Sequence, residues 1–175
     1  MLSRWGELHG PREHAYVELL KKYETKTVPL GKYVELDGDI AMILAGGGAS
    51  LVAMDSLVQA GGRPGNYLEI AGNPDPTFVK EAAAIVFSRP GLRAIWIAGS
   101  FANFTDIQVT LRATREAIEE AGLRLPVFIR RDGPHAEEAQ EEAREWAERL
   151  GIPLVFGRAD TPFLESAKQL MTFIS

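Results

Sequence analysis

The sequence predicts an α/β fold in which a parallel sheet is covered by helices on both faces. Three observations support this prediction. Short apolar segments alternate with segments in which apolar residues recur at helical spacing, and this alternation is typical of βαβ units. Glycine, proline or aspartate stands at most segment ends, where helices start or stop. The segment Ala94–Ala98 has no polar residue, as expected of a strand that is buried on both faces.

The first part of the chain does not follow this alternation. Arg12–Tyr23 is compatible with a helix, and Thr27–Leu36 is compatible with an extended segment that reaches the Asp37-Gly38 turn. Asp-Gly pairs are favoured in two-residue hairpin turns. We therefore expect Lys32–Leu36 to form an antiparallel edge strand, joined as a hairpin to the first core strand.

Five strands and five helices are predicted over the rest of the chain. Each strand is a run of three to five mainly apolar residues, and each helix that follows carries an apolar stripe. The predicted strands are Ile40–Leu44, Asn66–Ile70, Ala94–Ala98, Val127–Arg130 and Leu154–Phe156. The predicted helices are Leu51–Ala60, a segment from Asp75 that includes Phe78, Ala82 and Ile85, a segment from Ile107 through Ile118, a segment from Ala139 to Leu150, and Phe163–Phe173.

Residues at the segment ends support these boundaries. Asp75 and Pro76 supply a helix N-cap and a first-turn proline, while Gly122 and Gly151 end the helices that precede them. Right-handed crossovers between parallel strands then favour the strand order 2-1-3-4-5. The predicted fold is thus a flavodoxin-like, doubly wound, parallel five-stranded sheet.

Length and composition exclude several classes of protein. A chain of 175 residues with 46% hydrophobic and 25% charged residues fits one globular domain, not a disordered chain or an enzyme with separate nucleotide and substrate domains. No apolar stretch approaches the ~20 residues that span a bilayer, and no signal segment opens the chain, so we expect a cytoplasmic protein without a membrane partner. The absence of cysteine excludes disulfides and thiolate chemistry, and the net charge of −5 argues against a nucleic-acid partner.

Two loops are the best candidates for a binding site. In a doubly wound sheet, ligands bind beyond the C-terminal strand ends where the strand order reverses, here between the loops after the first and third strands. These loops are 45–50, Ala-Gly-Gly-Gly-Ala-Ser, and 99–105, Gly-Ser-Phe-Ala-Asn-Phe-Thr. Each opens onto a helix N-terminus, whose amide hydrogens and partial positive charge suit a phosphate or carboxylate. Ser50 and Thr105 are predicted to be N-caps or hydroxyl ligands, and Asn103 offers a donor and an acceptor.

The loop after the fourth strand carries two adjacent arginines, Arg130 and Arg131. Because neighbouring residues on a strand point to opposite faces, we expect at most one of them to face the crevice and the other to lie on the surface. His9, His14 and His135 are too scattered for a metal triad, and no Gly-x-Gly-x-x-Gly fingerprint or Walker lysine is present.

Several motifs, taken in order, resemble the citrate-binding domain of ATP-citrate lyase. They are residues 45–50, Gly65-Asn66-Tyr67, Ala102-Asn103-Phe104-Thr105-Asp106, Arg130-Arg131-Asp132-Gly133-Pro134 and Gly151-Ile152-Pro153. More distantly, Tyr33 to about Leu170 is similar to the C-terminal ligase domain of the succinyl-CoA synthetase β subunit. The resemblance implies a flavodoxin-like ligase domain over 33–175, after an N-terminal extension over 1–32. It also implies an anion-binding set: Gly47, Gly48, Ala49, Ser50, Asn103, Phe104, Thr105 and Arg131, with Arg131 clamping a carboxylate.

The resemblance further implies a reaction in which an acid is activated as an acyl phosphate, with phosphate from a phosphohistidine, and then forms a CoA thioester. The ligand is then a di- or tricarboxylate (citrate or succinate) or phosphate. In that family, the ATP-grasp part and the CoA and phosphohistidine parts lie outside the region matched here. ATP, magnesium and CoA are therefore implied only through partner chains, with no cofactor bound and no activity in this chain alone.

Two departures and two alternatives accompany this expectation. Ala45 stands where succinate-type enzymes have asparagine, which favours the citrate type, and His135 stands where the family has asparagine. The alternative function is a non-catalytic metabolite-binding or assembly module derived from such a ligase, with a homo-oligomer left open. A flavin-binding or phosphoacceptor protein is a weaker third reading: no acidic cluster at the predicted strand ends indicates a phosphoacceptor, and a colourless purified protein would exclude a bound flavin.

Overall fold

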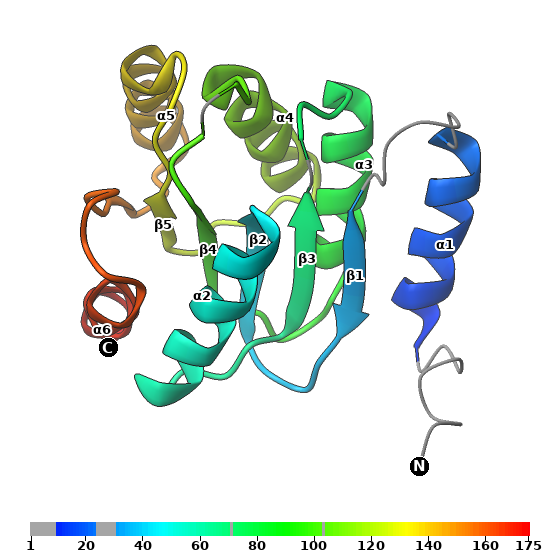
Figure 1. Ribbon diagram of the computed structural model, residues 1–175, viewed down its shortest axis with the longest axis horizontal. Coiled ribbons are helices and arrows are strands. Elements are labelled where there is room, and N and C mark those ends of the chain that lie inside the picture. The colour runs from blue at the N-terminus through cyan, green and yellow to red at the C-terminus, as the bar shows by residue number, and fades with distance from the viewer. Residues whose placement is uncertain (1–9, 24–30, 71, 103) are drawn as a thin grey trace.

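The computed structural model describes residues 10–23, 31–70, 72–102 and 104–175. Within these residues the chain forms six strands and six helices (Figure 1). The strands are β1 (Lys32–Glu35), β2 (Ile40–Ala45), β3 (Asn66–Ile70), β4 (Ala94–Gly99), β5 (Val127–Arg130) and β6 (Leu154–Phe156). The helices are α1 (Pro11–Tyr23), α2 (Gly47–Gln59), α3 (Pro76–Phe87), α4 (Ile107–Glu120), α5 (Ala136–Leu150) and α6 (Phe163–Phe173). None of these described helices is long and apolar enough to cross a membrane.

The strands form one mixed sheet in the order β1-β3-β2-β4-β5-β6. β3, β2, β4, β5 and β6 are parallel, and β1 lies antiparallel to β3 at the edge. The predicted α/β class and the antiparallel edge strand are confirmed. The strand count is corrected from five to six, because the edge strand adds a position that the 2-1-3-4-5 order does not contain.

The predicted hairpin between Lys32–Leu36 and the first core strand is wrong. β1 pairs with β3, with Val34 opposite Tyr67, because both edges of β2 are already occupied by β3 and β4. The connection after β1 is instead fastened to the segment before β3. There, the amides of Gly38 and Asp39 donate to the carbonyls of Pro64 and Arg63 at 2.9 and 3.0 Å. The Asp37-Gly38 turn therefore carries the chain past β3, and it does not fold the chain back onto its own strand.

Helices cover both faces of the sheet, as Figure 1 shows. α1, α3, α4 and α5 pack in succession over one face, and α2 and α6 pack together over the other. Successive strand residues point to opposite faces of the sheet, so each central strand contributes side chains to two apolar cores. Ile43 and Ile97 belong to the core under α3 and α4, while Met42 and Trp96 belong to the core under α2 and α6. Every residue of β4 is buried, which confirms the prediction from its apolar sequence.

Local sequence explains where several helices begin and end. Asp75 caps α3 by accepting the amide of Thr77 at 2.8 Å, with Pro76 in the first helical position, as predicted. At the C-terminus of α5, Gly151 adopts the left-handed conformation with φ of 65°. Its amide and the next one satisfy carbonyls of the last turn, which ends that helix as predicted.

An ion-pair cluster on the surface joins α4 to α5. The carboxylate of Glu142 accepts hydrogen bonds from Arg112 at 2.7 Å, from Arg115 at 2.8 Å and from Gln108 at 2.6 Å. The bonded guanidinium of Arg112 is the main cause that lowers the pKa of Glu142 to about 2. The cluster thus stabilises the packing of the two helices while Glu142 is ionised.

This lowered pKa predicts the acid dependence of stability. A carboxyl group whose pKa is lower in the folded than in the unfolded chain adds stability above its unfolded pKa, and this stability is lost as the pH falls toward 2. We therefore expect Glu142→Gln to lose about 1 kcal/mol at neutral pH, because the cluster is partly screened by solvent. The gap from wild type should narrow between pH 4.5 and 2 in urea titrations. A gap that stays constant over this range would contradict the assignment.

Candidate functional site

The loops after β2 and β4 meet at the C-terminal edge of the sheet. β2 and β4 are neighbours, but the helices that follow them, α2 and α4, cover opposite faces. The amide of Ser100 reaches the carbonyl of Ala45 at 3.4 Å, and a side chain at Gly46 would meet Ser100 Oγ at 2.6 Å. The structure therefore brings the two loops together where the sequence predicted a crevice.

α2 begins without a side-chain cap. Gly46 occupies the N-cap position with φ of 88°, a conformation that glycine adopts without strain, and no side chain bonds to the helix start. The first intrahelical hydrogen bond runs from the amide of Ser50 to the carbonyl of Gly46, so the amides of Gly47, Gly48 and Ala49 have no acceptor within the helix. These free donors and the helix dipole make this N-terminus suitable for an anion.

The prediction that Ser50 caps this helix is wrong. Because the helix starts at Gly47, Ser50 lies inside the first turn, where it is fully buried. Its hydroxyl donates back to the carbonyl of Gly46 at 3.2 Å. Ser50 therefore stabilises the turn from within, and no described group accepts a hydrogen bond from the amides of the three residues before it.

α4 differs from α2, because its N-terminus is fully capped. Asp106 is the N-cap residue and accepts the amide of Val109 at 3.1 Å, and the amide of Ile107 donates to the carbonyl of Pro134 at 3.0 Å. The prediction that Thr105 caps the helix is wrong, since its hydroxyl donates to the carbonyl of Gly72 at 2.6 Å. Of the two helix N-termini predicted at the crevice, α2 alone presents free donors.

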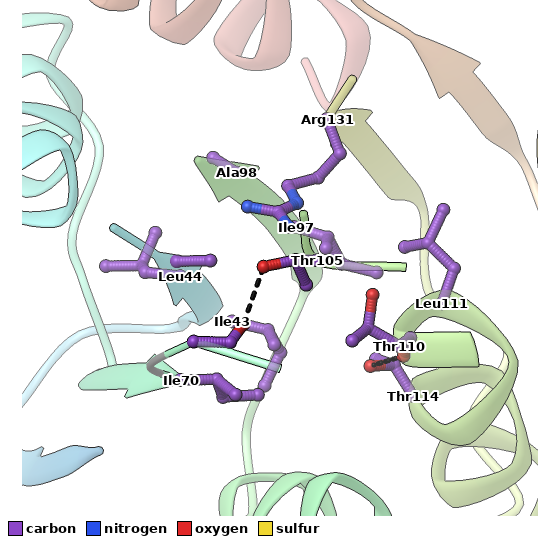
Figure 2. Close-up of a pocket in the computed structure, with 12 residues that line it drawn as sticks. Ile43, Leu44, Ile70, Ile97, Ala98, Thr105, Thr110, Leu111, Thr114 and Arg131 are labelled. Carbon is purple, nitrogen blue, oxygen red and sulfur yellow. Dashed lines mark hydrogen bonds between the residues drawn. The ribbon is translucent and has the colours of Figure 1, made fainter. Parts of the chain in front are cut away.

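A small cavity of about 30 Å³ lies beneath these loops, between the ends of β2, β3 and β4 and the first turns of α4 (Figure 2). The guanidinium of Arg131 reaches from the end of β5 over Ile97 and Ala98 into it. The other described side chains around it are apolar or threonine: Ile43, Leu44, Ala45, Ile70, Thr105, Thr110, Leu111 and Thr114. One cation therefore faces a mainly apolar cavity.

Arg131 is buried, and none of the residues that the structure describes is an acidic partner for it. Its residue is 7% exposed, and burial lowers the pKa of its guanidinium to about 10. Within the described ranges, no hydrogen bond or ion pair joins this guanidinium to another group. Isolated buried charges are costly, and native proteins usually pair them. A group of this kind beside a cavity is the arrangement expected of an anion-binding site that is complete only with its ligand.

Gly99 makes room for this arginine. A side-chain carbon at Gly99 would overlap Arg131 Nη1 and would lie 2.7 Å from the carbonyl oxygen of Ala45. The last residue of β4 therefore has to be glycine for the guanidinium to reach the cavity. The sequence predicts Gly99 in the binding loop, but no local pattern indicates this role.

Arg130 is also buried, contrary to the prediction that one of the two arginines lies on the surface. Its guanidinium donates to the carbonyls of Gly99 and Ala159, both at 2.7 Å, and to the carbonyl of Thr161 at 2.7 and 3.0 Å. It also lies 3.9 Å from the ring centre of Phe163. Arg130 thus ties the end of β4 to the loop before α6. The sequence could not indicate this contact, because the accepting groups are backbone carbonyls.

These contacts predict a large loss of stability for Arg130→Lys. Lysine cannot reproduce the planar set of donors, so buried carbonyls would lose their partners, each costing about 1–3 kcal/mol. We expect the free energy of unfolding to fall by about 2–4 kcal/mol in urea titrations. Arg124→Lys is the matched control, because the side chain of Arg124 donates to the carbonyl of Leu123 at an exposed site. Equal stability of the two variants would contradict the role of Arg130.

The remaining residues that were predicted for the site lie in different environments. Asn103 lies outside the described residues, Gly47 and Gly48 are exposed, and Phe104 is 69% exposed. His135, which is too far from the other histidines in the sequence to predict a metal site, adopts a left-handed φ of 58°. Its Nδ1 lies 2.9 Å from the Oδ2 of Asp106, which joins the loop after β5 to the loop after β4. The structure therefore places Arg131 and Thr105 at one cavity, with the α2 amides at the adjoining loop.

Comparisons with known proteins identify a matching family and several relatives of this chain. Residues 11–165 match the family model of the ATP citrate lyase citrate-binding domain. The β subunits of ADP-forming succinate–CoA ligase from Rubrobacter xylanophilus and Staphylothermus marinus are 34% and 32% identical, over 78% and 84% of this chain. The chain spans only 35% and 39% of those two relatives.

Among solved structures, ATP citrate lyase from Methanothrix soehngenii, in complex with citrate and coenzyme A, is similar in fold. It superimposes with a TM-score of 0.81 and 24% identity, over 95% of this chain and 47% of that chain. The two proteins therefore share the fold that positions the loops described above.

Proposed function

Because the chain belongs to the citrate-binding family of ATP citrate lyase, we propose that it is the carboxylate-binding part of an acid–CoA ligase. The observation that carries the proposal is the buried guanidinium of Arg131, which faces a cavity and has no acidic partner in the described part of the chain. A carboxylate in this cavity would supply the missing negative charge. Paired guanidinium and carboxylate groups form short, charge-assisted hydrogen bonds that fix the orientation of the acid.

The α2 N-terminus supplies a second anion-binding element. The free amides of Gly47, Gly48 and Ala49 would hold a second negative group of the acid, or a phosphoryl group, outside the cavity. Ser50 and Thr105 support the two loops through their hydrogen bonds to Gly46 and Gly72. In this arrangement Arg131 anchors one end of the acid, and the reacting end faces solvent and the partner chains.

ATP, magnesium and coenzyme A are proposed to enter only through partner chains. The glycine loop carries no lysine to bind phosphates, and the described residues contain no group of three or more side chains suited to a metal ion. These residues therefore do not fit a nucleotide–metal site. We propose that an ATP-grasp chain and a CoA-binding chain with a phosphohistidine supply those sites, and that this chain holds the acid.

Titration of the chain with citrate, succinate and phosphate, followed by thermal unfolding, tests the binding proposal. A ligand at ten times its Kd should stabilise the folded chain by about 1.4 kcal/mol. Asn103→Ala and Arg131→Ala should remove the effect, while Arg158→Ala, on the surface near β6, should not. The proposal fails if no di- or tricarboxylate shifts the unfolding temperature.

Co-purification tests the proposed ligase role separately. A ligase component should capture an ATP-grasp chain and a CoA-binding chain, and the assembly should form a CoA thioester from the acid that binds. A chain that binds an acid but purifies only with itself would instead be a non-catalytic metabolite-binding module, the alternative that the sequence left open.

A further inference from the structure

His135 and Asp106 form an imidazole–carboxylate pair at the C-terminal edge of the sheet. Nδ1 of His135 lies 2.9 Å from Oδ2 of Asp106. The other oxygen of Asp106 accepts the amide of Val109 at 3.1 Å, which fixes the carboxylate at the start of α4. Burial acts to raise the pKa of Asp106, but the bonds from Val109 and His135 outweigh it and lower that pKa. Asp106 is therefore ionised at neutral pH, and the proton of the pair lies on Nδ1 of His135.

The second ring nitrogen of His135, Nε2, is the basic atom of this pair. A neutral imidazole has one N–H, so a proton held on Nδ1 leaves the lone pair on Nε2. None of the described residues forms a hydrogen bond with Nε2, and the side chain of His135 is 56% exposed. In such pairs the carboxylate keeps the imidazole in this tautomer and stabilises the imidazolium that forms when Nε2 takes a proton. His135 is thus arranged to accept a proton from a molecule that arrives from solvent.

The backbone holds His135 in a fixed place. Among the described residues it is the one non-glycine residue with a positive φ, a conformation that is uncommon and occurs often at functional sites. The loop that carries it is bonded to the loop after β4. The amides of Ala102 and Ile107 donate to the carbonyls of Asp132 and Pro134 at 2.9 and 3.0 Å. These bonds fix the position of the imidazole relative to the Arg131 cavity.

The pair lies beside that cavity. Asp106 directly follows Thr105, and the hydroxyl of Thr110 donates to the backbone carbonyl of Asp106 at 3.0 Å; both threonines line the cavity (Figure 2). The described side chains that line the cavity are apolar, threonine or Arg131, and none of these takes up a proton near neutral pH. A base for chemistry at the outer end of a bound acid therefore has to come from the surrounding loops, where His135 lies.

We infer that His135 is the general base of the thioester-forming step. This inference rests on the proposed function. The thiol sulfur attacks the carbonyl carbon of the acyl phosphate, and the carbon–sulfur bond forms. The bond from that carbon to the phosphate oxygen breaks, phosphate leaves with the electron pair, and the thiol proton passes to Nε2 of His135. Asp106 is the positioning residue that holds the imidazole in the basic tautomer.

The size of the expected effect follows from the acidity of thiols. A free thiol has a pKa of about 8.5 and is mostly protonated at pH 7, whereas the thiolate is the nucleophile. General bases contribute about 10²- to 10⁴-fold. We expect His135→Asn to lower kcat about 100-fold or more, with little change in KM, because Arg131 still anchors the acid. Asp106→Asn, which retains a capping oxygen, should lower kcat roughly tenfold or more.

A partial reaction that needs neither ATP nor a partner chain tests the inference. Succinyl phosphate and pantetheine are mixed with the chain, and the thioester is followed by its absorbance. Wild type should exceed the rate without protein and should saturate with succinyl phosphate. His14→Asn is the matched control, because His14 is an exposed histidine whose Nδ1 bonds to the backbone carbonyl of Gly10 at 2.9 Å. It should react like wild type.

Rescue by free imidazole separates a lost base from a damaged fold. His135→Gly accommodates the left-handed backbone and leaves space for a small molecule. Added imidazole should restore part of the rate of this variant and should not affect His14→Asn. Thermal unfolding without ligand shows whether each variant is folded.

The outcomes are distinct, and one of them concerns Glu69. Its Oε2 accepts the hydroxyl of Tyr67 at 3.0 Å, and its Oε1 would lie 3.5 Å from a side-chain carbon at Gly47. A rate that falls in Glu69→Gln but not in His135→Asn would assign the proton transfer to Glu69 and overturn the inference. Wild type that is stabilised by succinate but does not accelerate the reaction also overturns it, and leaves the carboxylate site intact. If no acid stabilises the chain and the reaction is not accelerated, the proposed function itself is wrong.

Discussion

Replacing Arg131 with methionine is expected to abolish carboxylate binding and to stabilise the chain in the absence of ligand. Methionine fills a similar volume without a charge, so the cavity would lose its cation. Removing one partner of a buried charged pair costs about 2–5 kcal/mol, which corresponds to an affinity loss of roughly 30-fold or more. The gain in stability follows from the burial of a guanidinium that no described residue pairs with.

The lowered pKa of Arg131 sets the size and the pH range of this gain. A base whose pKa is lower in the folded chain destabilises the fold while it is charged, so the cost persists at every pH below about 10 and fades as the pH rises further. The difference from its ordinary pKa corresponds to about 3 kcal/mol, from which lost packing of the arginine stem must be subtracted. We expect Arg131→Met to raise the free energy of unfolding by about 1–3 kcal/mol at pH 7.

Urea titration and calorimetry measure the two effects on the same variant. Arg131→Lys is the matched control, because it keeps the charge without the forked donors. It should retain weak binding without the gain in stability. A less stable Arg131→Met chain that still binds succinate or citrate would show that Arg131 is a structural residue and that the anion binds elsewhere.

The second large effect is expected for Gly99→Ala. The added methyl group would overlap Arg131 Nη1 and crowd the carbonyl of Ala45, so the guanidinium would have to leave its place. We expect carboxylate affinity to fall about 10- to 100-fold, and overpacking to cost about 1–3 kcal/mol of stability. Affinity should fall more than lost stability alone explains, because the cation itself is displaced.

Gly122→Ala is the control that distinguishes displacement of the Arg131 guanidinium from a general loss of stability. Gly122 has a φ of 67° beyond the end of α4, with open space around its Cα, so alanine there costs about 1–2 kcal/mol of backbone strain far from the cavity. Calorimetric titration should show unchanged carboxylate affinity for this folded control. If Gly99→Ala also binds with wild-type affinity, the position of Arg131 does not depend on Gly99.

The sequence predicted the parallel core well, because its signals are local. Apolar runs such as Ala94–Ala98 mark strands by themselves, and caps such as Asp75 with Pro76 act within a few residues. The pairing of β1 could not be predicted in this way. An Asp-Gly turn favours a hairpin locally, but the occupied edges of β2 override it, and this competition arises only in the assembled sheet.

The sequence predicted which loops would meet at the crevice, but not how the groups on those loops are arranged. Strand order and loop composition located the crevice, and the resemblance to the citrate-binding family selected Arg131. Which helix N-terminus is free depends on backbone geometry: Gly46 leaves α2 uncapped, while Asp106 caps α4. The position of the Arg131 guanidinium depends on Gly99, 32 residues earlier in the sequence and on a neighbouring strand, so no local pattern reveals it.

The central claim is that Arg131 is the cation that receives a carboxylate at this crevice. A crystal structure of the chain with succinate tests it most directly. We expect one carboxylate inside the cavity, with both oxygens within hydrogen-bond distance of the Arg131 guanidinium and the second carboxylate near the amides of Gly48 and Ala49. Succinate bound at another surface, with the guanidinium of Arg131 still unpaired, would contradict the claim.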